Sequence, residues 1–290
     1  MHEVAGTVFG RWYVTLFGLT FAWRAVRHLG WRRTAVYTVV AVTVGALAEN
    51  GSVHIGFPYT HYTFNQHLRG KELFVGDVPL MVPLSYTFMA YFAFASGRLL
   101  ASGPWRTRAR HVWHEWLLAL VLAVWALWIL DPVSRLGQKF YLGRVFAYRG
   151  PGFWFGLPLG SQLGFTLTAA VLLAVLFRLA RDEPDRPVDG IRHHPHAIAL
   201  LTYKVQVFHL AVVAFVIGAD TIGGAAFLMW VPVAAMTAVY WSSLSADRLA
   251  VRSAATSASA GAEVEGPRAL DLERDDVGER LGVGQRDGGG

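Results

Sequence analysis

Long apolar stretches, each followed by a short polar segment, repeat along most of the chain. A stretch of about 20 apolar residues can cross the ~30 Å hydrocarbon core of a bilayer as one helix. Such stretches lie near residues 10–29, 34–49, 78–97, 113–130, 153–177, 197–217 and 222–244. The pattern therefore predicts an all-α fold, a polytopic membrane helical bundle with about seven transmembrane helices, formed by residues 1–244.

The distribution of arginine predicts how these helices are oriented. Short loops rich in arginine and lysine are retained in the cytoplasm. The segments 24–33, 98–110 and 178–192 each carry four arginines and should share the cytoplasmic side, although segment 135–149 on the other side is also basic. The N-terminus is then outside. The segments that begin at Glu49 and Asp131 are expected at one membrane face.

The end of the chain has a different composition. After about Ser245 the residues are mostly Ala, Ser, Gly, Glu, Asp and Arg, and the sequence ends in three glycines. Such a segment has too little apolar surface to bury a core. We expect residues 245–290 to form a disordered cytoplasmic tail.

Overall composition supports a membrane location. Hydrophobic residues make up 54% of the chain and charged residues only 16%, so we expect a multi-pass protein of the cell membrane. The net charge of +6 suits anionic lipid headgroups, and it accompanies no nucleic-acid-binding motif. The chain has no cysteine, which excludes disulfides, thiolate nucleophiles and cysteine-held metal clusters.

Polar side chains gather where two of the apolar stretches end. The run from Glu49 to Tyr62 follows the second stretch, and Asp131-Pro132 follows the fourth. A carboxyl group at the negative end of a helix, near hydrocarbon, favours its protonated form. A protonated carboxyl is a general acid. The arrangement thus indicates a site that acts on a molecule dissolved in the bilayer.

Structural roles are also open for these residues. Glu49 and Asp131 could cap their helices or pair with a nearby arginine such as Arg135. Asp77 opens the third stretch, where aspartate is a favoured N-cap. His54 and the histidine seven residues later lack the spacing of a metal-binding helix and suit hydrogen bonding better.

Four motifs occur together in a fixed order. They are the run from Glu49 to Tyr62, then Val78-Pro-Leu-Met-Val-Pro-Leu84, Leu130-Asp-Pro132, and Trp154-Phe-Gly-Leu-Pro-Leu159 with Gly164. Jointly they resemble the carotenoid biosynthesis protein family of membrane carotenoid hydratases, which contains the bisanhydrobacterioruberin hydratases and the γ-carotene 1′-hydratases. The likeness covers roughly residues 35–245. A joint pattern of this kind is more specific than any single motif.

The chain departs from the pattern of that family at several positions of the expected pocket wall. Ser52 replaces a glycine, Tyr59-Thr60 replace Phe-Gly, and Tyr86 replaces a tryptophan. Ser161-Gln162 and Phe165 replace Asn-Phe and a second tryptophan. Both leading acids are kept, so the resemblance supports the family more firmly than one substrate.

The resemblance implies a carotenoid hydratase of the hydro-lyase type. Water is added, without a cofactor, to the terminal C1=C2 double bond of an acyclic (ψ) carotenoid end group, and a tertiary 1-hydroxy carotenoid results. One acid donates a proton, and the other orients or deprotonates water. Aromatic faces stabilise the cation. The implied catalytic residues are Glu49, Asp131 and Asp77, and the implied substrate-binding residues are His54, Tyr59, Tyr62, Trp154 and Phe155.

Other functions fit some of the same features. A membrane protein that binds carotenoid or holds pathway enzymes together without catalysis is one alternative, and an isoprenoid isomerase is another. His193-His194-Pro195-His196 has metal-binding chemistry but lies in a loop on the opposite face, and we predict neither a metal nor a cofactor. Lys204 within a span is reminiscent of retinal attachment, but a rhodopsin would have no use for the two acid-bearing motifs. The expected partners are carotenoid in the bilayer and, in addition, other enzymes of the pathway.

Overall fold

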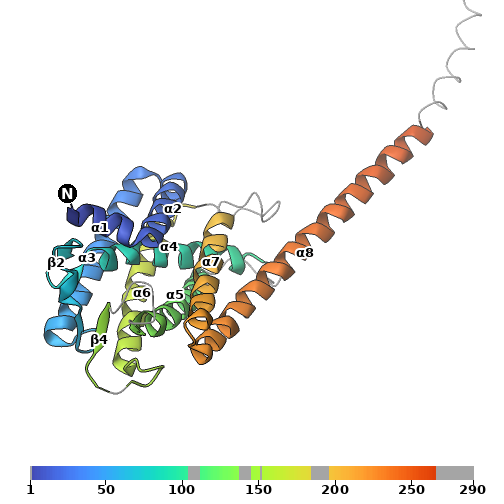
Figure 1. The fold of residues 1–290 in the computed structure, drawn as a ribbon. Helices are drawn as coiled ribbons and strands as arrows, with labels where there is room; N and C mark the ends of the chain where they lie inside the picture. Colours follow the sequence, from blue (N-terminus) through green and yellow to red (C-terminus); the bar gives the residue numbers. More distant parts are fainter. Residues whose placement is uncertain (1, 104–111, 137–144, 151, 184–195, 266–290) are drawn as a thin grey trace, which may run out of the picture. The chain divides into compact units, whose positions relative to one another are not determined.

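The computed structural model describes residues 2–103, 112–136, 145–150, 152–183 and 196–265, and side-chain environments as far as Ser242. Its helices and strands follow one another as shown in Figure 1. The helices are α1 His2–Gly10, α2 Trp12–Leu29, α3 Trp31–Ile55, α4 Met81–Ala101, α5 Val112–Arg135, α6 Leu159–Leu179, α7 Ala197–Val216 and α8 Asp220–Glu265, with a short 3-10 helix at Gln66–Leu68. The strands are β1 Tyr62–Phe64, β2 Phe74–Val75, β3 Val78–Pro79 and β4 Phe146–Tyr148.

The expected all-α class is confirmed, with two short two-stranded ladders as the sheet structure of the described residues. Five described helices are long and apolar enough to cross a membrane: α3, α5, α6, α7 and the Asp220–Ser242 part of α8. These helices indicate a membrane protein. The other two expected spans are also helical, as α2 and α4, but they do not meet the same criterion of length and hydropathy.

Helix α4 forms the centre of the unit Met1–Trp241. Every residue from Tyr86 to Leu100 is buried, and α2, α3, α5, α6 and α7 all pack against this helix. Small residues let the neighbouring helices approach closely. A Cβ atom added at Gly97 would lie 2.7 Å from the backbone nitrogen of Ala119 in α5. Glycine at this contact therefore lets the backbones of α4 and α5 approach closely.

The expected tail begins close to a structural boundary. A second unit starts at Ser242, near the predicted domain limit at residue 244. Helix α8 nevertheless continues to Glu265, so residues 245–265 are helical where we expected disorder. Their alanine-rich composition has a high helix propensity even without apolar surface to bury. Residues 266–290 lie outside the described part of the chain.

A buried ion cluster joins the ends of several helices far from the acid-bearing motifs. The carboxylate of Glu183 accepts hydrogen bonds from His28 (2.8 Å), from His196 (3.2 Å) and from Arg98. Arg98 also pairs with Glu115 of α5 at 3.2 Å. Burial lowers the pKa of His196 to about 4. Although burial opposes the charge of Glu183, the two histidines hold its pKa well below the usual range.

This cluster bears on the metal question raised by the histidine-rich loop. His28, Glu183 and His196 place possible ligand atoms within 4.8 Å of one another. The guanidinium of Arg98 already contacts the same carboxylate, and a cation beside a metal ion is unfavourable. The arrangement is better explained as an ion cluster that ties α2, α4 and α7 together. Residues 193–195 lie outside the described part of the chain.

Removing the charge of Glu183 should destabilise the protein. In Glu183→Gln the buried Arg98 loses a charged partner, so the free energy of unfolding should fall by about 3 kcal/mol. Unfolding followed in detergent measures this. Asp182→Asn is the matched control, because the neighbouring carboxylate is 58% exposed and pairs at the surface with Arg33, where a salt bridge contributes less than about 1 kcal/mol. Equal effects of the two substitutions would contradict a structural role for the cluster.

Candidate active site

A cavity of about 120 Å³ lies in the interior of the unit. Residues from α2, α3, α4, α5, α6, α7, β1 and β4 form its wall, and most of the lining is apolar or aromatic. Glu49 and Asp131, the two acids that lead the sequence motifs, both line it. The structure therefore brings the acids of the two motifs to one cavity, and the membrane face that they share stays a prediction.

Glu49 is held by tyrosine hydroxyl groups. Its side chain is buried in α3, with 3% of the residue exposed. The Tyr86 hydroxyl of α4 donates to Oε1 at 2.6 Å, and the Tyr62 hydroxyl of β1 donates to Oε2. The oxygen of Tyr86 also lies 3.1 Å from that of Tyr59, whose hydroxyl donates to Thr168 at 2.8 Å. Burial raises the pKa of Tyr59 well above its ordinary value, so the Tyr59 hydroxyl keeps its proton.

Asp131 has a different environment. It is buried in α5, and only 7% of the residue is exposed. Its Oδ2 atom has no hydrogen-bond partner among the described residues. An unpaired carboxylate is costly to bury, whereas a neutral carboxyl costs far less. The cavity thus contains one acid whose two oxygens accept hydrogen bonds and one acid with an oxygen that has no hydrogen-bond partner among the described residues.

A short ladder joins the two acid-bearing segments. Strands β1 and β4 pair antiparallel, with Tyr62 opposite Tyr148 and Phe64 opposite Phe146. These four rings pack with centroids 5.2–6.3 Å apart and all line the cavity. The Tyr148 hydroxyl lies 2.5 Å from that of Ser161, and burial raises the pKa of Tyr148. The ladder therefore supplies an aromatic wall made from both segments.

The expectation that both acids end their helices was wrong. Helix α3 continues to Ile55, and α5 continues to Arg135 with Pro132 inside it. Proline has no backbone N–H, so the carbonyl four residues earlier loses its helical hydrogen bond. That carbonyl belongs to Trp128, and it accepts instead from the indole nitrogen of Trp154 at 2.9 Å. This replacement bond lets the helix pass through Pro132.

Trp154 and Phe155 support the site without lining it. Neither contributes to the wall of the cavity. Trp154 packs beside Trp128, with ring centroids 5.3 Å apart, and the carbonyl of Phe155 accepts a hydrogen bond from Arg135 at 3.1 Å. The arginine that the sequence offered as a partner for Asp131 therefore binds the following loop. These contacts hold the last turn of α5, which follows Asp131.

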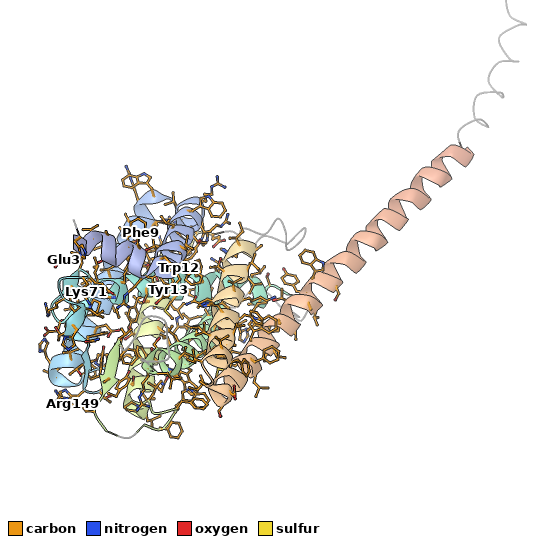
Figure 2. The ribbon with its side chains drawn as sticks, in the orientation of Figure 1. Glu3, Phe9, Trp12, Tyr13, Lys71 and Arg149 are labelled. Atoms are coloured by element: carbon orange, nitrogen blue, oxygen red, sulfur yellow. The ribbon has the colours of Figure 1, made fainter. Side chains whose placement is uncertain are left out.

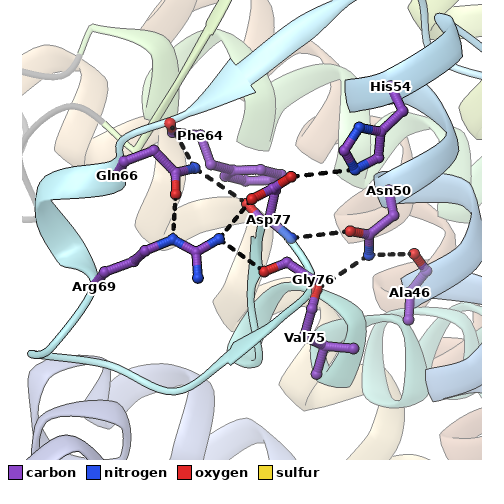
Figure 3. A network of polar contacts seen from close by, with 9 residues as sticks. All are labelled: Ala46, Asn50, His54, Phe64, Gln66, Arg69, Val75, Gly76 and Asp77. Atoms are coloured by element: carbon purple, nitrogen blue, oxygen red, sulfur yellow. Dashed lines mark hydrogen bonds and ion pairs between the residues drawn. The ribbon is translucent and has the colours of Figure 1, made fainter.

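Asp77 and His54 form a separate cluster at the surface. His54 Nε2 lies 3.2 Å from Asp77 Oδ2, and Arg69 donates to the other carboxylate oxygen at 2.5 Å (Figure 3). Asn50 accepts from the backbone N–H of Asp77 at 3.0 Å. The Asp77 side chain is 38% exposed and does not line the cavity. These contacts hold the loop before α4 against α3, and they leave Asp77 and His54 away from the two buried acids.

Several residues that line the cavity were not identified from the sequence as functional candidates. Tyr86 was noted only as a replacement for tryptophan, yet it bonds to Glu49. Tyr148 carried no signal, because its position depends on pairing between distant strands. Gln206 and His209 of α7 also line the cavity. Polar residues within an apolar span were the available signal for this pair.

Trp154→Phe tests the support of the α5 end. The change keeps an aromatic ring but removes the indole N–H, so the Trp128 carbonyl loses its partner. We expect the free energy of unfolding to fall by about 1 kcal/mol. Trp113→Phe is the control, because Trp113 lies near the start of the same helix and is 61% exposed. A loss in the control as large as in Trp154→Phe would argue against this role.

Comparison with known proteins places these features in a family. A family model described as carotenoid biosynthesis protein matches residues 9–251, which is more than half of the 290-residue chain. Searches among curated proteins and among solved structures found no match. The matched region includes both buried acids, the β1–β4 ladder and every other residue that lines the cavity. The chain therefore belongs to the carotenoid biosynthesis protein family.

Proposed function

We propose that this member of the carotenoid biosynthesis family is a hydratase of the hydro-lyase type. It adds water to the terminal C1=C2 double bond of an acyclic carotenoid end group and forms a tertiary alcohol. The observation that carries the proposal is the pair of buried acids, Glu49 and Asp131, in one aromatic-walled cavity. Hydration is neither an oxidation nor a reduction, so the reaction needs a proton donor, a proton acceptor and water.

Because the two acids have different surroundings, we assign one as the proton donor and the other as the proton acceptor. Asp131, with an unbonded buried oxygen, carries the proton and transfers it to C2 of the alkene. The electron pair of the double bond forms the new C–H bond and leaves a tertiary cation at C1. Glu49, whose oxygens accept hydrogen bonds from two tyrosines, is the proposed base. It takes a proton from water as the water oxygen bonds to C1.

The aromatic wall suits the charge that develops between these steps. A cation over the face of an aromatic ring gains about 0.5–2 kcal/mol. Tyr62, Phe64 and Phe146 supply such faces next to Glu49. The ladder residues thus take the role that the sequence analysis gave to Trp154 and Phe155. Tyr59 acts indirectly, through its contact with Tyr86.

The location of the reaction follows from its substrate. A carotenoid is dissolved in the hydrocarbon of a bilayer, and we propose that the protein is a multi-pass protein of the cell membrane. The five apolar helices support this placement. We also propose that other enzymes of the pathway are its partners, because they deliver and remove an insoluble substrate.

Neutralising either buried acid should nearly abolish hydration. Loss of a positioned general acid or base costs about 10²–10⁴-fold in rate, so Asp131→Asn and Glu49→Gln should each lose at least about a hundredfold. The measurement is the mass of pigments extracted from a lycopene-producing bacterial host that expresses each variant. Asp182→Asn serves as the control, and Asp77→Asn should keep most activity because its carboxylate lies in the surface cluster. Normal hydration by both buried-acid variants would contradict the proposal.

Deuterium uptake separates the two roles. In D2O the wild-type protein should form hydrated product with deuterium at C2. If the cation loses the original hydrogen from C2 before water adds, the double bond re-forms with deuterium at C2. Glu49→Gln should therefore keep this exchange into recovered substrate while it loses product. Asp131→Asn should lose both. The reverse result would exchange the assigned roles, and exchange without any product in the wild type would indicate an isomerase.

A further inference from the structure

The cavity extends from the buried acids to the space between α2 and α7. Tyr13 and Phe17 of α2 line it, as do His209 and Leu210 of α7. Tyr13, Phe17 and His209 are all partly exposed, whereas Glu49 and Asp131 are buried. Figure 2 marks Tyr13 at the beginning of α2. These three lining residues therefore also reach the outside of the unit.

Helices α2 and α7 are held together at their other ends. The rings of His28 and His196 have centroids 4.5 Å apart, at the last turn of α2 and the first residue before α7. Phe17 lies eleven residues from His28, and His209 thirteen residues from His196, which is about 16–20 Å of helix. The two helices thus meet at the ion cluster and have the cavity between them further along.

The outer faces of α2 and α7 carry exposed apolar side chains. Leu16 and Leu19 of α2 are more than half exposed, and Phe208 and Val212 of α7 are more than 40% exposed. Apolar side chains on the outside of a membrane helix face lipid tails. Helix α2 does not meet the span criterion but packs beside α7, which does, so an opening between these faces would lead into hydrocarbon rather than into water.

The volume of the cavity limits how much of the substrate fits inside it. An apolar cavity of about 150 Å³ binds benzene, so the present one, at about 120 Å³, has room for the branched end of an isoprenoid chain. The remainder of a carotenoid is a long, rigid polyene, and it must extend out of the cavity. An opening towards lipid tails matches its chemistry.

We propose that α2 and α7 form a lateral opening through which the carotenoid reaches the acids, with the polyene bound between Phe17 and His209. This inference rests on the proposed function, because it places the substrate of that reaction. It adds a binding position for the hydrocarbon chain, separate from the position of the reacting end. Phe17 is then a residue that contacts the polyene.

The cysteine-free sequence allows a direct test by reversible blocking. A single thiol is introduced by Phe17→Cys and modified with a bulky methanethiosulfonate reagent, and a reductant later removes the group. Leu16→Cys is the matched control, because Leu16 is the preceding residue and is 53% exposed on the lipid-facing side. Each modified protein is compared with the same protein before modification and after reduction.

Modification at position 17 should slow conversion of a full-length acyclic carotenoid by about tenfold or more, and reduction should restore the rate. Modification at position 16 should change little. A short acyclic terpenoid with the same terminal double bond should be converted at a similar rate in both cases, since it places no polyene in the opening. Unchanged carotenoid conversion by modified Phe17→Cys would overturn the lateral opening while leaving hydration intact. Failure of the unmodified wild type to hydrate any substrate would instead overturn the proposed function.

Discussion

The burial of Glu49 is the constraint on which the rest of the site depends. A carboxylate removed from water is costly unless hydrogen bonds replace its hydration. The two tyrosines that donate these bonds come from α4 and β1, so both elements must be in place at once. Gly45, one turn before Glu49, makes the contact with α4 possible, because a Cβ atom there would lie 2.9 Å from the ring of Tyr86. Satisfying one acid therefore fixes the relation of α3, α4 and the ladder.

Several positions where the sequence analysis noted a departure from the resembled pattern lie around this same network. Ser52 accepts the backbone N–H of Tyr59 at 2.9 Å, and Tyr59 stacks on Phe165 with ring centroids 4.3 Å apart. Three substituted positions thus contact one another. A tyrosine hydroxyl in place of an apolar ring needs a partner when it is buried. Tyr59 finds one in Thr168, so these replacements are mutually consistent as a set.

The sequence was informative about long elements and about the two acids, and less so about contacts between loops. Hydropathy located the helices because burial in lipid demands long apolar runs. Arginine asymmetry predicted that Glu49 and Asp131 share one membrane face, and in the structure both acids line one cavity. The continuation of α5 through Pro132 depends on an indole 26 residues away along the chain, and no local pattern carries that information. Asp77 had the chemistry of a catalytic acid, but its neighbours Arg69 and His54 hold it at the surface.

The three-residue β1–β4 ladder limits how the loops of this protein can vary. Side chains alternate between the two faces of a strand, so a shift of one residue turns every side chain to the opposite face. With Tyr62 opposite Tyr148, such a shift would remove a donor from Glu49 and a ring from the cavity wall. Insertions within the loops on either side leave this pairing intact, whereas a single inserted residue in either strand does not. The lengths of the connecting segments can therefore differ among relatives, while the pairing register of these six positions stays the same.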